Sequence, residues 1–192
     1  MFNTETFAIM IIFYLLGSIS FAVISSKIFS IPDPRSFVSK DQGATNILRS
    51  GNKHAAFFTL IGDSLKGFIP VLYILNQNFN MNELYLLSFM ILLGHCYPIT
   101  LKFKGGKGVA TSLGILFALV PIVAFLVVLT WLITYYLFKV SGVSALIGFL
   151  LLPFFMFLID NDPYMIMISF ANVIFIFLTH KKNIIEFMSS QG

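Results

Sequence analysis

Three lysines and three glycines are interspersed in the segment K-F-K-G-G-K-G at residues 102–108. Glycine lets the backbone approach an oxyanion closely, and successive backbone N–H groups in a turn form an anion-binding nest. An apolar run begins at Val109, so we expect a helix whose positive N-terminal end faces the same point. A basic surface turn would explain the lysines but not the glycines between them. The spacing therefore predicts a phosphate-binding loop made by Lys104, Gly105, Gly106, Lys107 and Gly108.

A second polar segment, G-A-T-N-I-L-R at residues 43–49, follows a loop that contains two prolines. Thr45 and Asn46 are small hydrogen-bonding residues, and the guanidinium of Arg49 can hold a phosphate through two parallel hydrogen bonds. The alternative is a helix N-cap at Thr45 or Asn46, with Arg49 placed at the lipid headgroups. The residues alone leave both interpretations open.

Asp63 and Lys66 stand three residues apart within an apolar run, a spacing that puts both on one face of a helix. A charge at the centre of a bilayer costs several kcal/mol, so such a pair must face the interior of a helix bundle. The first interpretation is a structural ion pair that fixes helix packing. The second is a part in the floor of a binding site.

His180 and Asn183 lie at positions i and i+3, directly after the last apolar run. A histidine there can anchor the helix at the headgroup level, or it can belong to a site with Asn183 on the same face. His95, in L-G-H-C-Y-P at 93–98, is expected instead to make a buried hydrogen bond.

The composition indicates what kind of protein carries these groups. The chain has 192 residues, of which 58% are hydrophobic and only 10% are charged, and its mean hydropathy is +0.92. A soluble domain has about 25% charged residues. A soluble enzyme, a nucleic-acid-binding protein and a disordered chain are therefore excluded. Cys96 is the only cysteine, so no disulfide forms within the chain. We expect one polytopic membrane domain over residues 1–192.

Apolar runs predict the membrane-spanning helices, since about 20 apolar residues cross the hydrocarbon core. The stretch 109–138 is too long for one crossing, and Pro121 in its middle interrupts the helical hydrogen bonds. Dividing it there gives seven spans. They are Phe7–Phe29, 54–75, 84–101, 109–120, 121–138, 142–159 and 164–179.

The distribution of charge supports seven spans. Lysine and arginine occur in the connections 30–53, 102–108 and 139–141 and after residue 179, whereas the alternate connections have none. The positive-inside rule then places the N-terminus outside and the C-terminus in the cytoplasm. The predicted fold class is an all-α integral membrane protein with seven transmembrane helices.

The polar segments together carry a family resemblance over nearly the whole chain. The chain resembles the bacterial membrane acyltransferases that move an acyl chain from acyl phosphate to glycerol 3-phosphate. The motifs that carry it are L-G-S-I at 16–19, G-A-T-N-I-L-R at 43–49, G-D-S-L-K-G at 62–67, L-G-H-C-Y-P at 93–98, F-K-G-G-K-G-V-A-T at 103–111 and H-K-K-N-I at 180–184.

The resemblance implies an enzyme of phospholipid synthesis in the bacterial cytoplasmic membrane. Its substrates would be glycerol 3-phosphate and acyl phosphate, its products lysophosphatidic acid and phosphate, and its surroundings membrane lipid, with neither cofactor nor nucleic acid. The acidic residues do not cluster, so no metal site is predicted. The catalytic residues that the resemblance implies are Ser39, Arg49, Lys107, His180 and Asn183. The resemblance also implies that Ser141 binds substrate. We add Thr45, Asn46, Asp63 and Lys66 as substrate-binding candidates, for the reasons given above.

This chemistry requires no nucleophile from the protein, because an acyl phosphate is already an activated mixed anhydride. The site must bring two anions together and orient one hydroxyl at the carbonyl, which suits lysine, arginine and backbone N–H groups. His180 is the one candidate residue that titrates near neutral pH when unperturbed. We expect it to position a substrate, and we keep general-base catalysis as the alternative.

The first motif departs from the family pattern Gly-Ser-Gly-Asn, since this chain reads Val38-Ser39-Lys40-Asp41. A β-branched valine does not easily adopt a positive φ, so the loop must have a different shape or the protein a different activity. This departure leaves open a catalytically altered relative that binds lipid or partners. A second alternative is a small transporter for an anionic or phosphorylated solute, which Asp63 and Lys66 within a span and a basic mouth would also fit.

Overall fold

The computed structural model describes residues 4–36 and 41–189, and every regular element within them is helical. The chain forms two compact units, Met1–Leu119 and Val120–Gly192, which are described one at a time. The all-α prediction is therefore confirmed for the described residues. The prediction of one domain over residues 1–192 stays a prediction.

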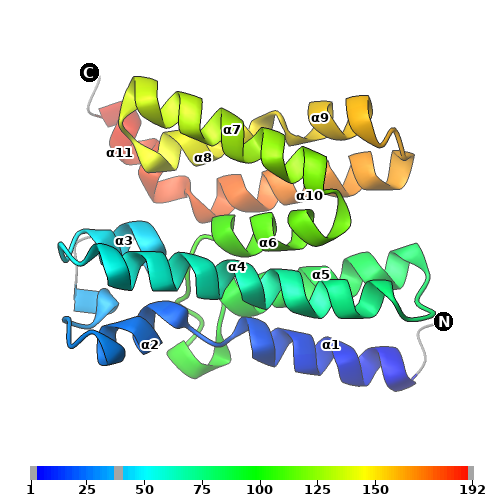
Figure 1. Ribbon diagram of the computed structural model, residues 1–192, viewed down its shortest axis with the longest axis horizontal. Coiled ribbons are helices and arrows are strands. Elements are labelled where there is room, and N and C mark those ends of the chain that lie inside the picture. Colours follow the sequence, from blue (N-terminus) through cyan, green and yellow to red (C-terminus); the bar gives the residue numbers. More distant parts are fainter. Residues whose placement is uncertain (1–3, 37–40, 190–192) are drawn as a thin grey trace. The chain divides into compact units, whose positions relative to one another are not determined.

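The described residues of the first unit form six α-helices and two short 3₁₀ turns. Figure 1 shows how these helices lie beside one another. In it, α1 packs against α5, and α4 packs against both α2 and α6. The helices are α1 (Thr4–Gly17), α2 (Phe21–Ile28), α3 (Ala44–Leu48), α4 (Lys53–Leu75), α5 (Met81–Cys96) and α6 (Val109–Leu119), with turns η1 (Pro34–Ser36) and η2 (Ile99–Leu101).

The first predicted span is interrupted between α1 and α2. The side chain of Ser18 donates to the carbonyl of Tyr14, and Ser20 caps α2 by accepting from the backbone N–H of Val23 at 3.3 Å. The carbonyl of Ile19, freed by the break, accepts from Lys66 Nζ at 2.7 Å. The sequence predicted one uninterrupted helix because the run is continuously apolar, and only the packed structure brings Lys66 to this point.

Glycines let two pairs of helices in the first unit touch backbone to backbone. A Cβ added to Gly17 or Gly94 would lie closer than 3.0 Å to the facing backbone of α5 or α1. The same holds for Gly67 against α6 and Gly114 against α4. Small residues at such contacts are typical of helices packed within a membrane. These contacts fix α5 and α6, the two helices that flank residues 102–108, which we call the glycine loop.

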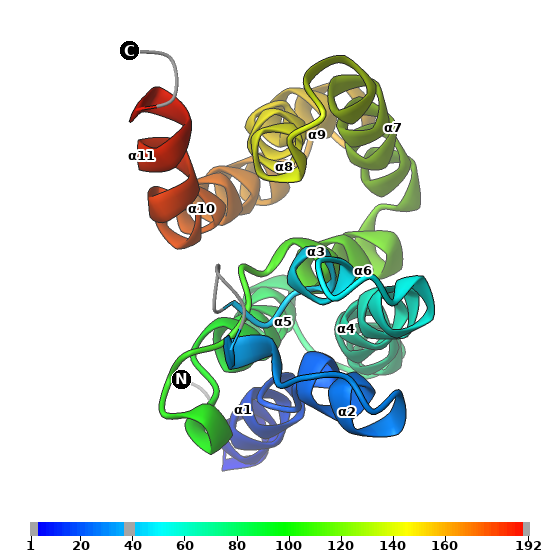
Figure 2. The same ribbon diagram turned by 90° about the vertical axis from the view of Figure 1, so that its left-hand side faces the viewer.

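The second unit contains α7 (Pro121–Phe138), α8 (Ser141–Leu150), α9 (Leu152–Ile159), α10 (Pro163–Thr179) and α11 (Lys181–Ser189) (Figure 2). The predicted division at Pro121 is confirmed, because α6 ends at Leu119 and α7 starts at the proline. The predicted run 142–159 is divided at Leu151, where Pro153 occupies the first turn of α9. Helix α11 was not predicted, since residues 181–189 continue past the apolar run.

Five helical segments within the described ranges are long and apolar enough to cross a membrane. They are Thr4–Ile28, Lys53–Leu75, Met81–Leu101, Pro121–Phe138 and Ser141–Ile159, and Val109–Leu119 and Pro163–Thr179 are shorter apolar helices. Each predicted span thus overlaps one or two helices, and the count of seven crossings stays a prediction. Many large apolar side chains are exposed, such as Phe125 and Ile133, as expected where the surroundings are lipid rather than water.

Candidate functional site

The glycine loop lies against the C-terminal end of α5. The backbone N–H of Gly105 donates to the carbonyl of Cys96, and that of Gly106 donates to the carbonyl of His95, both at 3.1 Å. A Cβ on Gly105 would lie closer than 3.0 Å to the His95 carbonyl, and one on Gly106 closer than 3.0 Å to the His95 ring. These two glycines therefore bring the loop onto α5. Their N–H groups bond to the protein itself rather than pointing at a ligand.

The backbone donors that remain for an anion are those at the start of α6. Gly108 has φ +90°, which turns the chain into this helix. The first helical hydrogen bond joins Ser112 N to Gly108 O at 2.8 Å. The backbone N–H groups of Val109, Ala110 and Thr111 come before it, so no carbonyl of the helix accepts from them. A helix N-terminus favours negative charge. The anion-binding part of the loop is thus its second half, beside Lys107.

Lys107 forms an ion pair that sequence reasoning missed. Its Nζ lies 2.7 Å from Asp41 Oδ2, and the two side chains are 25% and 16% exposed. Lys104, by contrast, has an exposed side chain, and its hydrogen bonds within the described residues are those of its backbone, to Leu101 and Gln42. The sequence offered one signal for this ion pair, which is the acidic Asp41 between Lys40 and Gln42.

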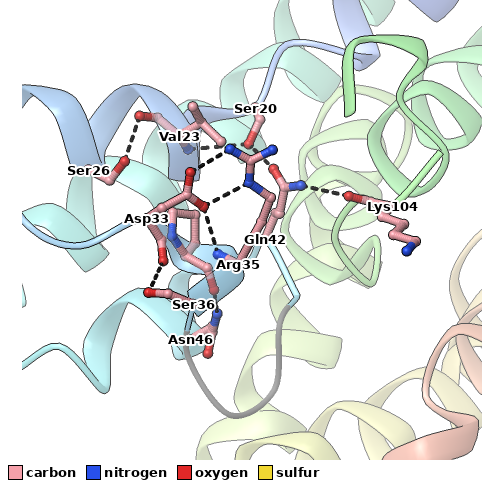
Figure 3. Close-up of polar contacts among 10 residues, drawn as sticks. Ser20, Val23, Ser26, Asp33, Arg35, Ser36, Gln42, Asn46 and Lys104 are labelled. Carbon is pink, nitrogen blue, oxygen red and sulfur yellow. Dashed lines mark hydrogen bonds and ion pairs between the residues drawn. The ribbon is translucent and has the colours of Figure 1, made fainter. Parts of the chain in front are cut away.

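Segment 41–43, which we call the strap, is tied to the glycine loop and to α2 (Figure 3). Gln42 Nε2 donates to the carbonyl of Lys104, and Ser20 Oγ donates to Gln42 Oε1, both at 2.6 Å. Asn46 Nδ2 donates to the carbonyls of Asp41 at 2.7 Å and Pro34 at 2.8 Å. Asn46 is buried, so within this structure its amide fixes the strap. Gln42 was not identified from the sequence.

Helix α3 carries the other candidates of the first polar segment. Thr45 and Arg49 are both exposed, and Arg49 is the C-cap residue of the helix. Among the side chains that the structure describes, none forms a hydrogen bond or ion pair with the Arg49 guanidinium. Ser39 lies outside the described residues.

A second arginine in this region is already engaged. Asp33 Oδ1 accepts from the backbone N–H and Nε of Arg35 at 2.8 Å, and Oδ2 accepts from Nη2 at 2.6 Å (Figure 3). The hydrogen bond from the guanidinium lowers the pKa of the Asp33 carboxyl below its ordinary value, against a smaller opposing effect of partial burial. The pair is exposed, so it is a surface interaction.

The predicted ion pair between Asp63 and Lys66 is present and buried. Lys66 Nζ lies 2.8 Å from Asp63 Oδ1, and the side chains are 6% and 2% exposed. His95, also buried as predicted, places Nδ1 3.6 Å from the same carboxylate oxygen. Because the His95 ring also lies under Gly106, this triad connects α4 to the glycine loop. The contacts confirm the structural interpretation of the pair, and a part in the floor of a binding site stays a prediction.

His180, Asn183 and Ser141 belong to the second unit. His180 ends α10, and its Nδ1 lies 2.8 Å from the Ile176 carbonyl. A carbonyl only accepts, so Nδ1 carries a proton and Nε2 is the nitrogen with the lone pair in the neutral ring. Asn183 lies in α11, and a Cβ added to Gly142, next to Ser141, would be 3.5 Å from its side chain. The unit thus brings Asn183 to the start of α8.

Asn183 Oδ1 is buried and has no hydrogen-bond partner among the described residues. A buried acceptor without a partner is costly, so we expect a ligand or an ordered water to bond to it. The candidates therefore form two groups. One surrounds Lys107 in the first unit, and the other surrounds His180 and Asn183 in the second. Within the described ranges, no three His, Cys, Asp or Glu side chains gather to hold a metal ion.

A family model described as glycerol-3-phosphate acyltransferase matches residues 7–190. A glycerol-3-phosphate acyltransferase of Dechloromonas aromatica is 51% identical over 140 residues, which are 73% of this chain and 71% of that protein. One of Ruthia magnifica subsp. Calyptogena magnifica is 44% identical over 95% of this chain and 93% of its own length.

Two solved structures share the fold. The crystal structure of PlsY, an integral membrane glycerol 3-phosphate acyltransferase, in its glycerol 3-phosphate form has a TM-score of 0.89 and 30% identity. The matched region covers 97% of this chain and 93% of the PlsY chain. The lysophosphatidic acid form of the same protein has a TM-score of 0.88 and 29% identity.

Proposed function

Because the chain belongs to the glycerol-3-phosphate acyltransferase family, we propose that it acylates glycerol 3-phosphate to lysophosphatidic acid with acyl phosphate as the donor. The observation that carries the proposal is Lys107 at the turn into α6, beside backbone donors that no helical hydrogen bond engages. A cation and a helix N-terminus at one point suit a phosphate group, and each substrate carries one.

The reaction needs charge neutralisation and orientation more than covalent catalysis. The glycerol hydroxyl attacks the acyl carbonyl, the bond from that carbon to the phosphate oxygen breaks, and inorganic phosphate leaves. Lys107 and Arg49 offset the repulsion between the two anions and stabilise the charge that develops on the leaving phosphate. The hydroxyl proton goes to a substrate phosphate, whose second pKa is near 6.

His180 is assigned a positioning role in this scheme. Its Nδ1 is engaged by the Ile176 carbonyl, so the ring is held in one orientation and presents Nε2. The family resemblance gives Asn183, whose Oδ1 has no hydrogen-bond partner among the described residues, and Ser141 a part in binding the same substrates. Ser39 has the corresponding role in the first motif. Thr45, Asp63 and Lys66 serve the site as well. Asp63 does so through its contact with His95, and Lys66 through its ion pair with Asp63.

We also propose seven crossings of the bacterial cytoplasmic membrane, with the N-terminus outside and the C-terminus in the cytoplasm. Basic residues on alternate connections support this orientation. With Cys96 replaced by serine, a cysteine introduced at position 161 is expected to react with an impermeant maleimide only from outside. One introduced at position 103, in the glycine loop, serves as the matched cytoplasmic control. Labelling of position 161 from the cytoplasm alone would overturn the orientation.

The function is tested by incubating the purified protein with radiolabelled glycerol 3-phosphate and, in separate reactions, palmitoyl phosphate, palmitoyl-CoA or palmitoyl acyl carrier protein. Lysophosphatidic acid is expected from palmitoyl phosphate alone. Product formed only from a thioester donor would contradict the assigned donor. Absence of lipid product, together with uptake of glycerol 3-phosphate into vesicles that contain the protein, would instead support a transporter.

A further inference from the structure

The ammonium of Lys107 is already in contact with an anion supplied by the chain itself. Asp41 Oδ2 lies 2.7 Å from Lys107 Nζ, and both groups are partly exposed. This is the distance at which a phosphate oxygen would bind the same ammonium. A phosphate-bearing ligand therefore meets a lysine whose charge is neutralised by Asp41.

The Asp41 backbone is held in place by two neighbouring contacts. Its carbonyl accepts from Asn46 Nδ2 at 2.7 Å. The next residue, Gln42, donates to the Lys104 carbonyl and thereby ties the strap to the loop that carries Lys107. The carboxylate is thus kept within reach of the ammonium by contacts that do not involve its own charge.

We propose that Asp41 determines substrate affinity by competing with a substrate phosphate for Lys107. The inference rests on the proposed function, because it takes Lys107 as the phosphate ligand. A bound phosphate must displace the carboxylate or share the ammonium with it, and two anions around one cation repel each other. The protein consequently binds a phosphate-bearing substrate more weakly than it would with a neutral side chain at position 41.

Asp41→Asn tests this competition with little other change. Asparagine has nearly the same size, and its backbone carbonyl still accepts from Asn46. A part-exposed ion pair has a modest strength, so we expect KM for one substrate to fall about two- to fivefold. The kcat is expected to stay at the parental value. The gain should shrink as salt rises from about 0.05 to 0.5 M, because salt screens exposed charges.

The measurement determines KM and kcat for glycerol 3-phosphate and for palmitoyl phosphate in separate series, so that the substrate whose phosphate meets Lys107 is identified. Asp33→Asn is the matched control, because Asp33 lies in the same connection but pairs with Arg35 instead. It should leave both KM values unchanged. Asp41→Glu, which keeps the charge, should retain the parental KM.

Calorimetric titration of the purified protein with glycerol 3-phosphate and with inorganic phosphate provides a readout that is independent of turnover. At least one of the two should bind about two- to fivefold more tightly to Asp41→Asn than to the parent. In a Lys107→Met background, Asp41→Asn should produce no such gain. If the parent makes no lysophosphatidic acid but this pattern holds, the proposed function fails and the competition at Lys107 stands.

Two results would overturn the inference. A higher KM or a lower kcat in Asp41→Asn would mean that Asp41 orients Lys107 for the substrate rather than competing with it. Unchanged KM values for both substrates, with unchanged binding of glycerol 3-phosphate and inorganic phosphate, would mean that the ion pair does not oppose binding.

Discussion

Replacing Lys107 by alanine is expected to reduce acyl transfer by about 10³-fold or more, while the protein remains folded. The substitution removes the cation at the turn into α6 and leaves the Asp41 carboxylate without its partner. The net charge of the site then becomes more negative by one, at the point where a phosphate must bind. Initial rates at subsaturating glycerol 3-phosphate measure the loss, and thermal unfolding in detergent verifies the fold.

Lys104→Ala is the matched control for this prediction. It removes a lysine from the same loop, but that side chain is exposed, and the carbonyl that Gln42 uses is retained. Its effect should stay within about tenfold, as for an exposed charge that contributes through the general field. Parental activity in Lys107→Ala would exclude the glycine loop from the active site.

The second large effect concerns stability. Lys66→Met is expected to lower the free energy of unfolding by about 3–5 kcal/mol, because it leaves the buried Asp63 carboxylate without its cation. It also removes the donor to the Ile19 carbonyl at the break between α1 and α2. The loss is measured by denaturant unfolding in detergent micelles, followed by the loss of helical far-ultraviolet circular dichroism.

Two variants separate the ion pair from other effects of the substitution. Lys53→Met makes the same change on the same helix, but at an exposed position, and should cost less than about 0.5 kcal/mol. Asp63→Asn combined with Lys66→Met removes both charges and should recover part of the loss. If Lys66→Met is no less stable than Lys53→Met, the buried pair does not hold the first unit together.

Local sequence signals were sufficient for several parts of this structure. The glycine loop and the start of α6 follow from glycines that stand directly before an apolar run, and Pro121 marks the end of one helix and the start of the next. The pair of Asp63 and Lys66 could be predicted because both residues lie on one helix. In each case the interacting residues are close in sequence, so helical periodicity fixes their geometry.

The contacts that could not be predicted join segments far apart in sequence. Asp41 meets Lys107, and Lys66 reaches Ile19, only after several helices have packed. The hydrogen-bond partners of the Gly105 and Gly106 N–H groups could not be predicted either. A glycine-rich loop has the same sequence whether its N–H groups face a ligand or another helix. Of the site residues, Ser39 lies outside the described ranges, and the roles of the others remain proposals.

The hydrogen bonds between the glycine loop and α5 also bear on the entropy of substrate binding. Ordering one residue of a flexible loop costs about 1–2 kcal/mol of conformational entropy. Here the backbone of Gly105 and Gly106 is already fixed to Cys96 and His95 during folding. A phosphate that arrives meets a preorganised surface, so its binding free energy is not reduced by the cost of ordering these residues. More of that free energy remains for stabilising the transition state of acyl transfer.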